Sequence, residues 1–119
     1  MITNGDMTVF CGFSGPDGRT WQRMYVHNVN WQDVSGSRAG DGGPATADRA
    51  MVYAALTIAT AVIRKGDILI RGIVTEELGA GGLTEKQMQA LHGSMRRVLS
   101  VKLCDNGSPP MQHVELEAG

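Results

Sequence analysis

The chain has 119 residues, with 11 lysines and arginines against 12 aspartates and glutamates, so its formal net charge is -1. This length suits a single domain with its own core, and a near-zero charge excludes a protein whose whole surface attracts nucleic acid. The longest uncharged run, residues 50–63, is shorter than the roughly 20 residues that a membrane-spanning helix needs.

The first 34 residues predict a β-hairpin. Apolar side chains recur at every second position over residues 7–13, and the segment 14–18 contains the glycine, proline and aspartate of a tight turn. We expect the return strand to bend near Asn28 and to direct Trp31 toward the core. The side chains expected on the apolar face of the first strand are Met7, Val9, Cys11 and Phe13.

Residues 35–48 are rich in glycine, serine and alanine and poor in large apolar side chains, which predicts a long flexible loop. Loops of this length without structure of their own are usually functional or disordered. No Gly-Lys-Ser/Thr follows, and no strand and helix flank the glycines, so a phosphate-binding loop is not indicated. Arg38 and Asp41 are the candidate contact residues of this loop.

Residues 49–63 are apolar nearly throughout, so periodicity does not separate helix from strand. The β-branched residues favour a strand, and we expect one with a break near Ala59. A turn over residues 64–67 then leads into a strand over residues 68–74, with Ile68 and Ile70 on one face.

One short helix is predicted over residues 84–92. Thr84 and Gln87 have the spacing of a capping box, and Gly93 suits a left-handed residue after the helix. Leu83 and Met88 have the positions of a hydrophobic staple, and the side chains expected to face the body are Met88 and Leu91.

Residues 97–117 predict a second hairpin, because two alternating segments flank a tip rich in turn-forming residues. Asn106, Ser108 and Met111 at or beside this tip are further candidate contacts with other subunits. The side chains expected to close the core are Leu99, Val101, Leu103, Val114 and Leu116.

Together these elements predict a mainly β fold over residues 1–119: one small antiparallel β-barrel or sandwich with a long glycine-rich loop and one short α-helix. The first six residues lack the basic and apolar regions of a secretory signal. Cys11 and Cys104 are expected to be unpaired core cysteines, which is typical of a reducing compartment.

No catalytic constellation is evident along the chain. The three histidines show no metal-ligand spacing, neither cysteine belongs to a Cys-x-x-Cys, and no Gly-x-Ser-x-Gly occurs. We therefore expect no enzyme activity, no cofactor and no metal site.

Four segments carry a resemblance to a known class of proteins. The chain resembles small proteins encoded in the structural gene block of tailed bacteriophages and prophages, near the head-tail joining genes. The matching segments are 3–10 (Thr-Asn-Gly-Asp-Met-Thr-Val-Phe), 29–32 (Val-Asn-Trp-Gln), 65–72 (Lys-Gly-Asp-Ile-Leu-Ile-Arg-Gly) and 101–114, with its Asp-Asn-Gly-Ser and Met-Gln-His. The chain departs from the pattern over 50–63, which is short and rich in alanine, and over 79–91, where a glycine-led helix replaces a linker.

The expected layout is also similar to that of head-closure proteins, which are called stoppers. That resemblance implies a virion protein at the head-tail interface, assembled in the bacterial cytoplasm, that forms a homo-oligomeric ring between the portal with its adaptor and the tail. Packaged DNA would pass through the channel of such a ring. Two alternatives stay open: a tail terminator or tail-completion protein, and a β-barrel protein that binds nucleic acid.

Overall fold

The computed structural model describes residues 3–16, 18–34, 49–79, 81–105, 107–108 and 111–119. Within these residues, six antiparallel strands form a closed barrel, which confirms the predicted mainly β fold. The strands are β1 (Gly5–Gly15), β2 (Gly18–Val34), β3 (Arg49–Ala55), β4 (Ile68–Arg71), β5 (Arg96–Cys104) and β6 (His113–Ala118). The predicted loop over residues 35–48 lies outside the described residues.

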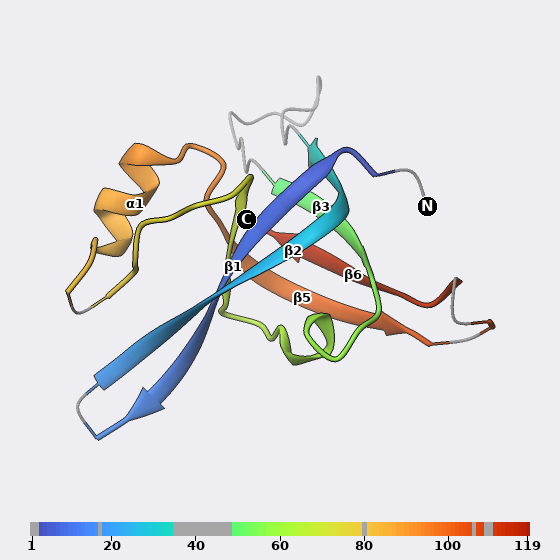
Figure 1. Cartoon of the computed structure of the whole chain (residues 1–119), viewed down its shortest axis with the longest axis horizontal. Helices are drawn as coiled ribbons and strands as arrows, with labels where there is room; N and C mark the ends of the chain where they lie inside the picture. The colour runs from blue at the N-terminus through green and yellow to red at the C-terminus, as the bar shows by residue number, and fades with distance from the viewer. Residues whose placement is uncertain (1–2, 17, 35–48, 80, 106, 109–110) are drawn as a thin grey trace, which may run out of the picture.

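The strand order around the barrel is β1-β2-β3-β6-β5-β4, and the barrel closes where β4 pairs with Met7–Phe10 of β1 (Figure 1). The long strand β2 bends, and this allows its first part to pair with β1 and its last part to pair with β3. At the bend Asn28 has φ 59°, and its backbone amide donates to the Asp6 carboxylate at 3.0 Å. The predicted bend near Asn28 is therefore confirmed.

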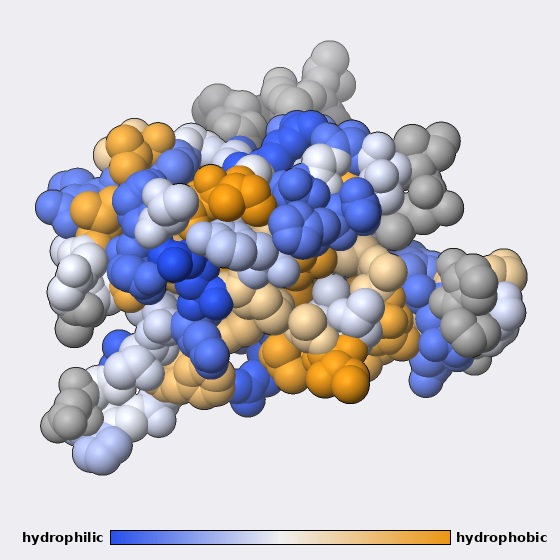
Figure 2. Space-filling view, in the orientation of Figure 1, coloured by the Kyte–Doolittle hydropathy of each residue, from blue (hydrophilic) through white to orange (hydrophobic). Residues whose placement is uncertain are grey.

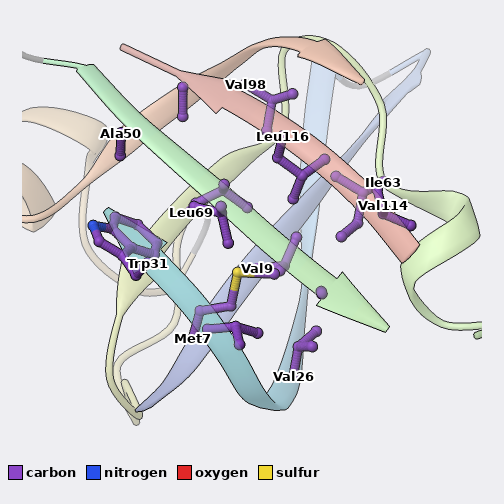
Figure 3. Close-up of a cluster of buried hydrophobic side chains, with 14 of the residues drawn as sticks. Met7, Val9, Val26, Trp31, Ala50, Ile63, Leu69, Val98, Val114 and Leu116 are labelled. Atoms are coloured by element: carbon purple, nitrogen blue, oxygen red, sulfur yellow. The ribbon is translucent and has the colours of Figure 1, made fainter. Parts of the chain in front are cut away.

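Apolar side chains fill the barrel interior, where Met7, Val9 and Trp31 meet side chains from β3, β4 and β6 (Figure 3). Trp31 is only 2% exposed, as predicted. A second cluster lies on the other face of β1 and β4 and includes Phe10, so β1 is buried on both faces. Phe13 was expected on the core face, but it is 45% exposed because it lies beyond the last residue of β1 that pairs with β4.

The prediction of a strand over residues 49–63 is correct only for its first half. β3 ends at Ala55, and a turn and a short 3-10 helix, η1 (Thr60–Val62), follow. The hydroxyl of Thr60 donates to the Ala55 carbonyl at 2.8 Å and accepts the Thr57 amide at 2.8 Å. Because threonine hydroxyls satisfy these backbone groups, the segment does not need a neighbouring strand.

The predicted turn over residues 64–67 is present, with Gly66 at φ 96° and the Asp67 amide donating to the Arg64 carbonyl at 3.1 Å. β4 then ends at Arg71, three residues earlier than predicted, because Gly72 takes φ 93°. Ile68 and Ile70 share the second cluster, as predicted, while Leu69 of the same strand enters the barrel.

The predicted helix is α1 (Glu85–Leu91), and its capping box between Thr84 and Gln87 is formed. Met88 is fully buried and Leu83 packs against the same cluster, but Leu91 is 60% exposed and does not face the body. Gly93 does not take a positive φ, so the predicted left-handed termination is wrong. No helix in the described ranges has the length and apolar character to cross a bilayer.

The closing hairpin forms from β5 and β6, with a register shift between Val98 and Ser100. This bulge moves Leu99 out of the predicted apolar face, so that Leu99 is 38% exposed and Val98 is buried instead. Leu103 pairs with Val114 near the end of the ladder and is 50% exposed. The predicted inward positions of Val101, Val114 and Leu116 are confirmed.

Candidate functional site

The hairpin of β1 and β2 extends past the barrel as a two-stranded arm, formed by residues 11–16 and 18–22 (Figure 1). β1 pairs with β4 only as far as Phe10, and β2 pairs with β3 only from Asn30 onward. Among the described strands, the arm therefore has no neighbour on either outer edge. An unpaired two-stranded ribbon is only marginally stable alone and offers free backbone groups to another chain.

An open groove of about 610 Å³ lies between the arm and the residues of η1. Phe13 and Val62 line it, and they are 45% and 51% exposed. Figure 2 shows apolar side chains gathered along the lower edge of the molecule, over the segment that follows β3 in Figure 1. We call the groove between the arm and η1 the arm groove; its lining residues are Cys11, Phe13, Gln22, Arg23, Met24, Ala61, Val62 and Arg64.

A buried carboxylate holds the base of the arm. Asp67 is 2% exposed; its Oδ1 accepts the Gly12 amide at 3.1 Å and its Oδ2 accepts the Arg64 amide at 2.9 Å. Burial, together with this carboxylate, raises the pKa of the neighbouring Cys11 thiol to about 11. Cys11 therefore stays protonated near neutral pH and is not a reactive nucleophile.

Cationic side chains line a second groove, of about 440 Å³, between the arm and the turn that precedes β4; Asp67 also lines it. Arg19, Arg64 and Lys65 supply the positive charge, and the Arg19 guanidinium lies 4.6 Å from the centre of the Trp21 ring. We call this second groove, with its cationic residues Arg19, Arg64 and Lys65, the basic groove. Its chemistry suits an anion such as a phosphate group.

The neighbouring Arg23–Tyr25 pair on β2 is engaged within the molecule. Arg23 forms an ion pair with Glu77 at 2.7 Å and donates to the Thr75 carbonyl at 2.7 Å. The Tyr25 hydroxyl donates to the Val74 carbonyl at 2.8 Å. These two side chains hold residues 74–77 against the barrel rather than offering a free stacking platform.

The structure brings together three potential metal ligands that chain spacing did not group. Cys104 pairs with His113 across the closing hairpin, and Glu115 lies two residues further along β6. One ligand atom from each lies within 4.8 Å of the others, and all three side chains are half-buried. The signal in the sequence was the alternation of β6, which directs His113 and Glu115 outward opposite Val114.

The His113 ring is oriented by two hydrogen-bonding contacts. Its Nδ1 lies 3.1 Å from the Met111 carbonyl, and its Nε2 lies 3.2 Å from Glu115 Oε1. Hydrogen bonding to the Met111 carbonyl, and then to Glu115, raises the pKa of His113. The His113 ring can therefore bind either a proton or another cation.

Two of the predicted contact residues lie in the described part of the closing-hairpin tip. Ser108 is exposed and its carbonyl accepts the Met111 amide at 2.9 Å, while the Met111 side chain is 69% exposed. Arg38, Asp41 and Asn106 lie outside the described residues.

Comparison with known proteins identifies a family. Residues 2–119 match a family of unknown function, DUF6751. No curated protein and no solved structure matches the chain.

Proposed function

We propose that this chain, which belongs to the DUF6751 family, is a structural protein of a tailed-bacteriophage virion that forms a ring at the head-tail interface. In this role it is a head-closure, or stopper, subunit between the portal with its adaptor and the tail, assembled in the bacterial cytoplasm. It does no covalent chemistry and needs no cofactor. The resemblance of four segments suggests this role, and the unpaired β1–β2 arm is the structural observation that best supports it.

The arm gives each subunit a means of contacting the next. Two strand edges with no neighbouring strand among the described residues, and the exposed Phe13 beside an apolar groove, are costly in an isolated protein, since they invite association. In a closed ring every subunit would place its arm against the same surface of its neighbour, so each arm and each groove is covered once. The proposed occupant of the arm groove is therefore a second copy of this chain.

The barrel supplies the rigid body that a connector layer requires. The tip of the closing hairpin carries Ser108 and Met111. These side chains are proposed contacts with a neighbouring subunit or with the layers above and below. Arg38, Asp41 and Asn106 complete the proposed contact set. The basic groove is the surface proposed to face packaged DNA in the channel.

A tail terminator or tail-completion protein is the alternative within the virion, because it would also form a ring. A nucleic-acid-binding barrel is the alternative from another class, and the basic groove is the observation that favours it. Against it, Arg23 and Tyr25 are engaged internally and the net charge is -1.

The ring is tested by native mass spectrometry and light scattering of the purified chain, with Phe13→Glu as the arm variant. Leu91→Glu is the matched control, since it places the same charge on an exposed apolar residue of α1. We expect a ring or a concentration-dependent oligomer for the wild-type chain and for Leu91→Glu, and a monomer for Phe13→Glu. A wild-type monomer at high concentration, or an unchanged oligomer for Phe13→Glu, contradicts the role of the arm.

The location is tested by imaging particles that carry a labelled copy of the chain. Label at the head-tail junction supports the stopper, and label at the distal end of the tail tube would replace it by the tail terminator. A salt-sensitive shift of the monomer with single-stranded DNA, without oligomerisation, would favour the nucleic-acid-binding alternative.

A further inference from the structure

We propose that Cys104, His113 and Glu115 form a binding site for a divalent transition metal, with Zn²⁺ as the best-suited ion. The three residues offer one thiolate, one imidazole and one carboxylate, which are the three side-chain ligand types that Zn²⁺ takes in proteins. This site is separate from the arm groove and does not depend on the proposed ring.

The register of the closing hairpin places the ligands on one surface. Cys104 is the last residue of β5 and His113 the first residue of β6, and the two form a directly opposed pair. Glu115 follows on the same face of β6, two residues further along. The ligands therefore come from a rigid ladder and not from separate loops.

The separations suit one tetrahedral ion. Bond lengths of about 2.0–2.3 Å to zinc place neighbouring ligand atoms about 3.3–3.8 Å apart. His113 Nε2 and Glu115 Oε1 already lie 3.2 Å apart, and all three ligand atoms lie within 4.8 Å of one another. Binding would draw the three atoms from at most 4.8 Å to this spacing, and a water molecule would take the fourth position.

A hydrogen bond at Nδ1 of His113 leaves Nε2 available to bind the metal. His113 Nδ1 lies 3.1 Å from the Met111 carbonyl, which accepts only if Nδ1 carries the proton. The neutral ring then has its lone pair on Nε2, beside Glu115. Metal-bound histidines in proteins almost always donate their other ring N–H to such an acceptor, which fixes the tautomer and the ring orientation.

Binding is coupled to protonation. Cys104 must bind as the thiolate and His113 as the neutral ring, so one proton is released to solvent per ion where only the thiol is protonated, two where the ring is protonated as well, and none where the thiol is already ionised. Glu115 faces the ring from its own strand, Lys102 lies opposite Glu115 on β5, and Tyr53 lies opposite Glu115 on β3. Acid weakens the site, and the positive charge of Lys102 weakens it at any pH at which that side chain is protonated.

The test uses the tag-free, reduced full chain titrated with Zn²⁺ against a chromophoric chelator, and with Co²⁺ followed by absorption. We expect one ion per chain and a thiolate-to-cobalt charge-transfer band. Cys104→Ser should abolish that band and weaken Zn²⁺ binding at least tenfold, and His113→Gln and Glu115→Gln should each weaken Zn²⁺ binding at least tenfold. All three side chains lie on the outer face, so circular dichroism should show unchanged folds.

His92→Gln is the matched control. His92 and Glu76 form another His–Glu pair, at 2.8 Å, but among the described residues no third ligand joins this pair to complete a metal-binding group. This variant should bind Zn²⁺ like the wild-type chain. A second measurement needs no variant: Zn²⁺ should shift the ring resonances of His113 and not those of His27. Absence of the cobalt band in the wild-type chain, or equal Zn²⁺ affinity in Cys104→Ser, would overturn the proposal.

Discussion

The buried carboxylate of Asp67 accepts the backbone amide of Gly12 at 3.1 Å, a contact that joins residues 55 positions apart. Its second oxygen accepts the Arg64 amide at 2.9 Å. One side chain therefore ties the base of the arm to the turn that precedes β4. The Gly-Asp of this turn, which reads as a simple local signal, also has a role in the tertiary structure.

Replacing Asp67 by Asn should destabilise the fold by about 1–3 kcal/mol, because one of the two buried backbone amides loses its carboxylate acceptor. The free energy of unfolding from urea titration measures the change. Asp105→Asn is the control, since Asp105 is exposed and its replacement should change the free energy by less than about 0.5 kcal/mol. Equal effects of the two substitutions would contradict the role given to Asp67.

Thr8→Val should cost a similar amount, about 1–3 kcal/mol, although the side chains have nearly the same shape. The Thr8 hydroxyl is fully buried; it donates to the Gly72 carbonyl at 2.8 Å and accepts the Val74 amide at 2.9 Å. Valine leaves both groups without a partner. Thr20→Val on the exposed arm is the control. It removes only a 3.4 Å hydrogen bond and should leave the free energy of unfolding, measured for both variants by thermal and urea unfolding, nearly unchanged.

Gly82→Ala should destabilise the segment that carries α1, by about 1–3 kcal/mol. A Cβ at Gly82 would lie 2.2 Å from the backbone oxygen of Glu77, which cannot move without breaking its bond to the Leu83 amide. Gly93→Ala is the control, since a Cβ there meets nothing within 4 Å and φ is not positive. Thermal unfolding of both variants separates a steric clash from a general need for glycine; an unchanged midpoint for Gly82→Ala would refute the clash.

His113 should titrate above its ordinary pKa in the metal-free chain, because the Met111 carbonyl and then Glu115 stabilise the charged ring, against burial and Lys102. A raised folded-state pKa stabilises the fold fully below the unfolded value of about 6.5, and this contribution is lost as the pH rises through the folded pKa. The stability advantage of wild-type over His113→Gln should therefore shrink as the pH rises from about 6 to about 8.

NMR titration of the His113 ring measures this pKa directly. Glu115→Gln should lower the midpoint, and adding Zn²⁺ should suppress the titration near neutral pH. A midpoint at or below the value of about 6.5 for an unperturbed histidine would contradict the assigned contacts.

Some features of this protein follow from the sequence alone because they depend on neighbouring residues. The first hairpin, the turn at Gly66 and the capping box of Thr84 and Gln87 are local, and each was predictable from residue type and spacing. Alternation along β1 and β6 likewise predicted a mainly β barrel.

Other features were decided by contacts between residues far apart in the chain. The bulge after Val98, where β5 pairs with β6, turned Leu99 outward. The register between β5 and β6 placed Cys104 opposite His113, which no spacing along the chain reveals. Sequence periodicity determined which elements form, whereas pairing register, which depends on how the whole barrel closes, decided which side chains meet.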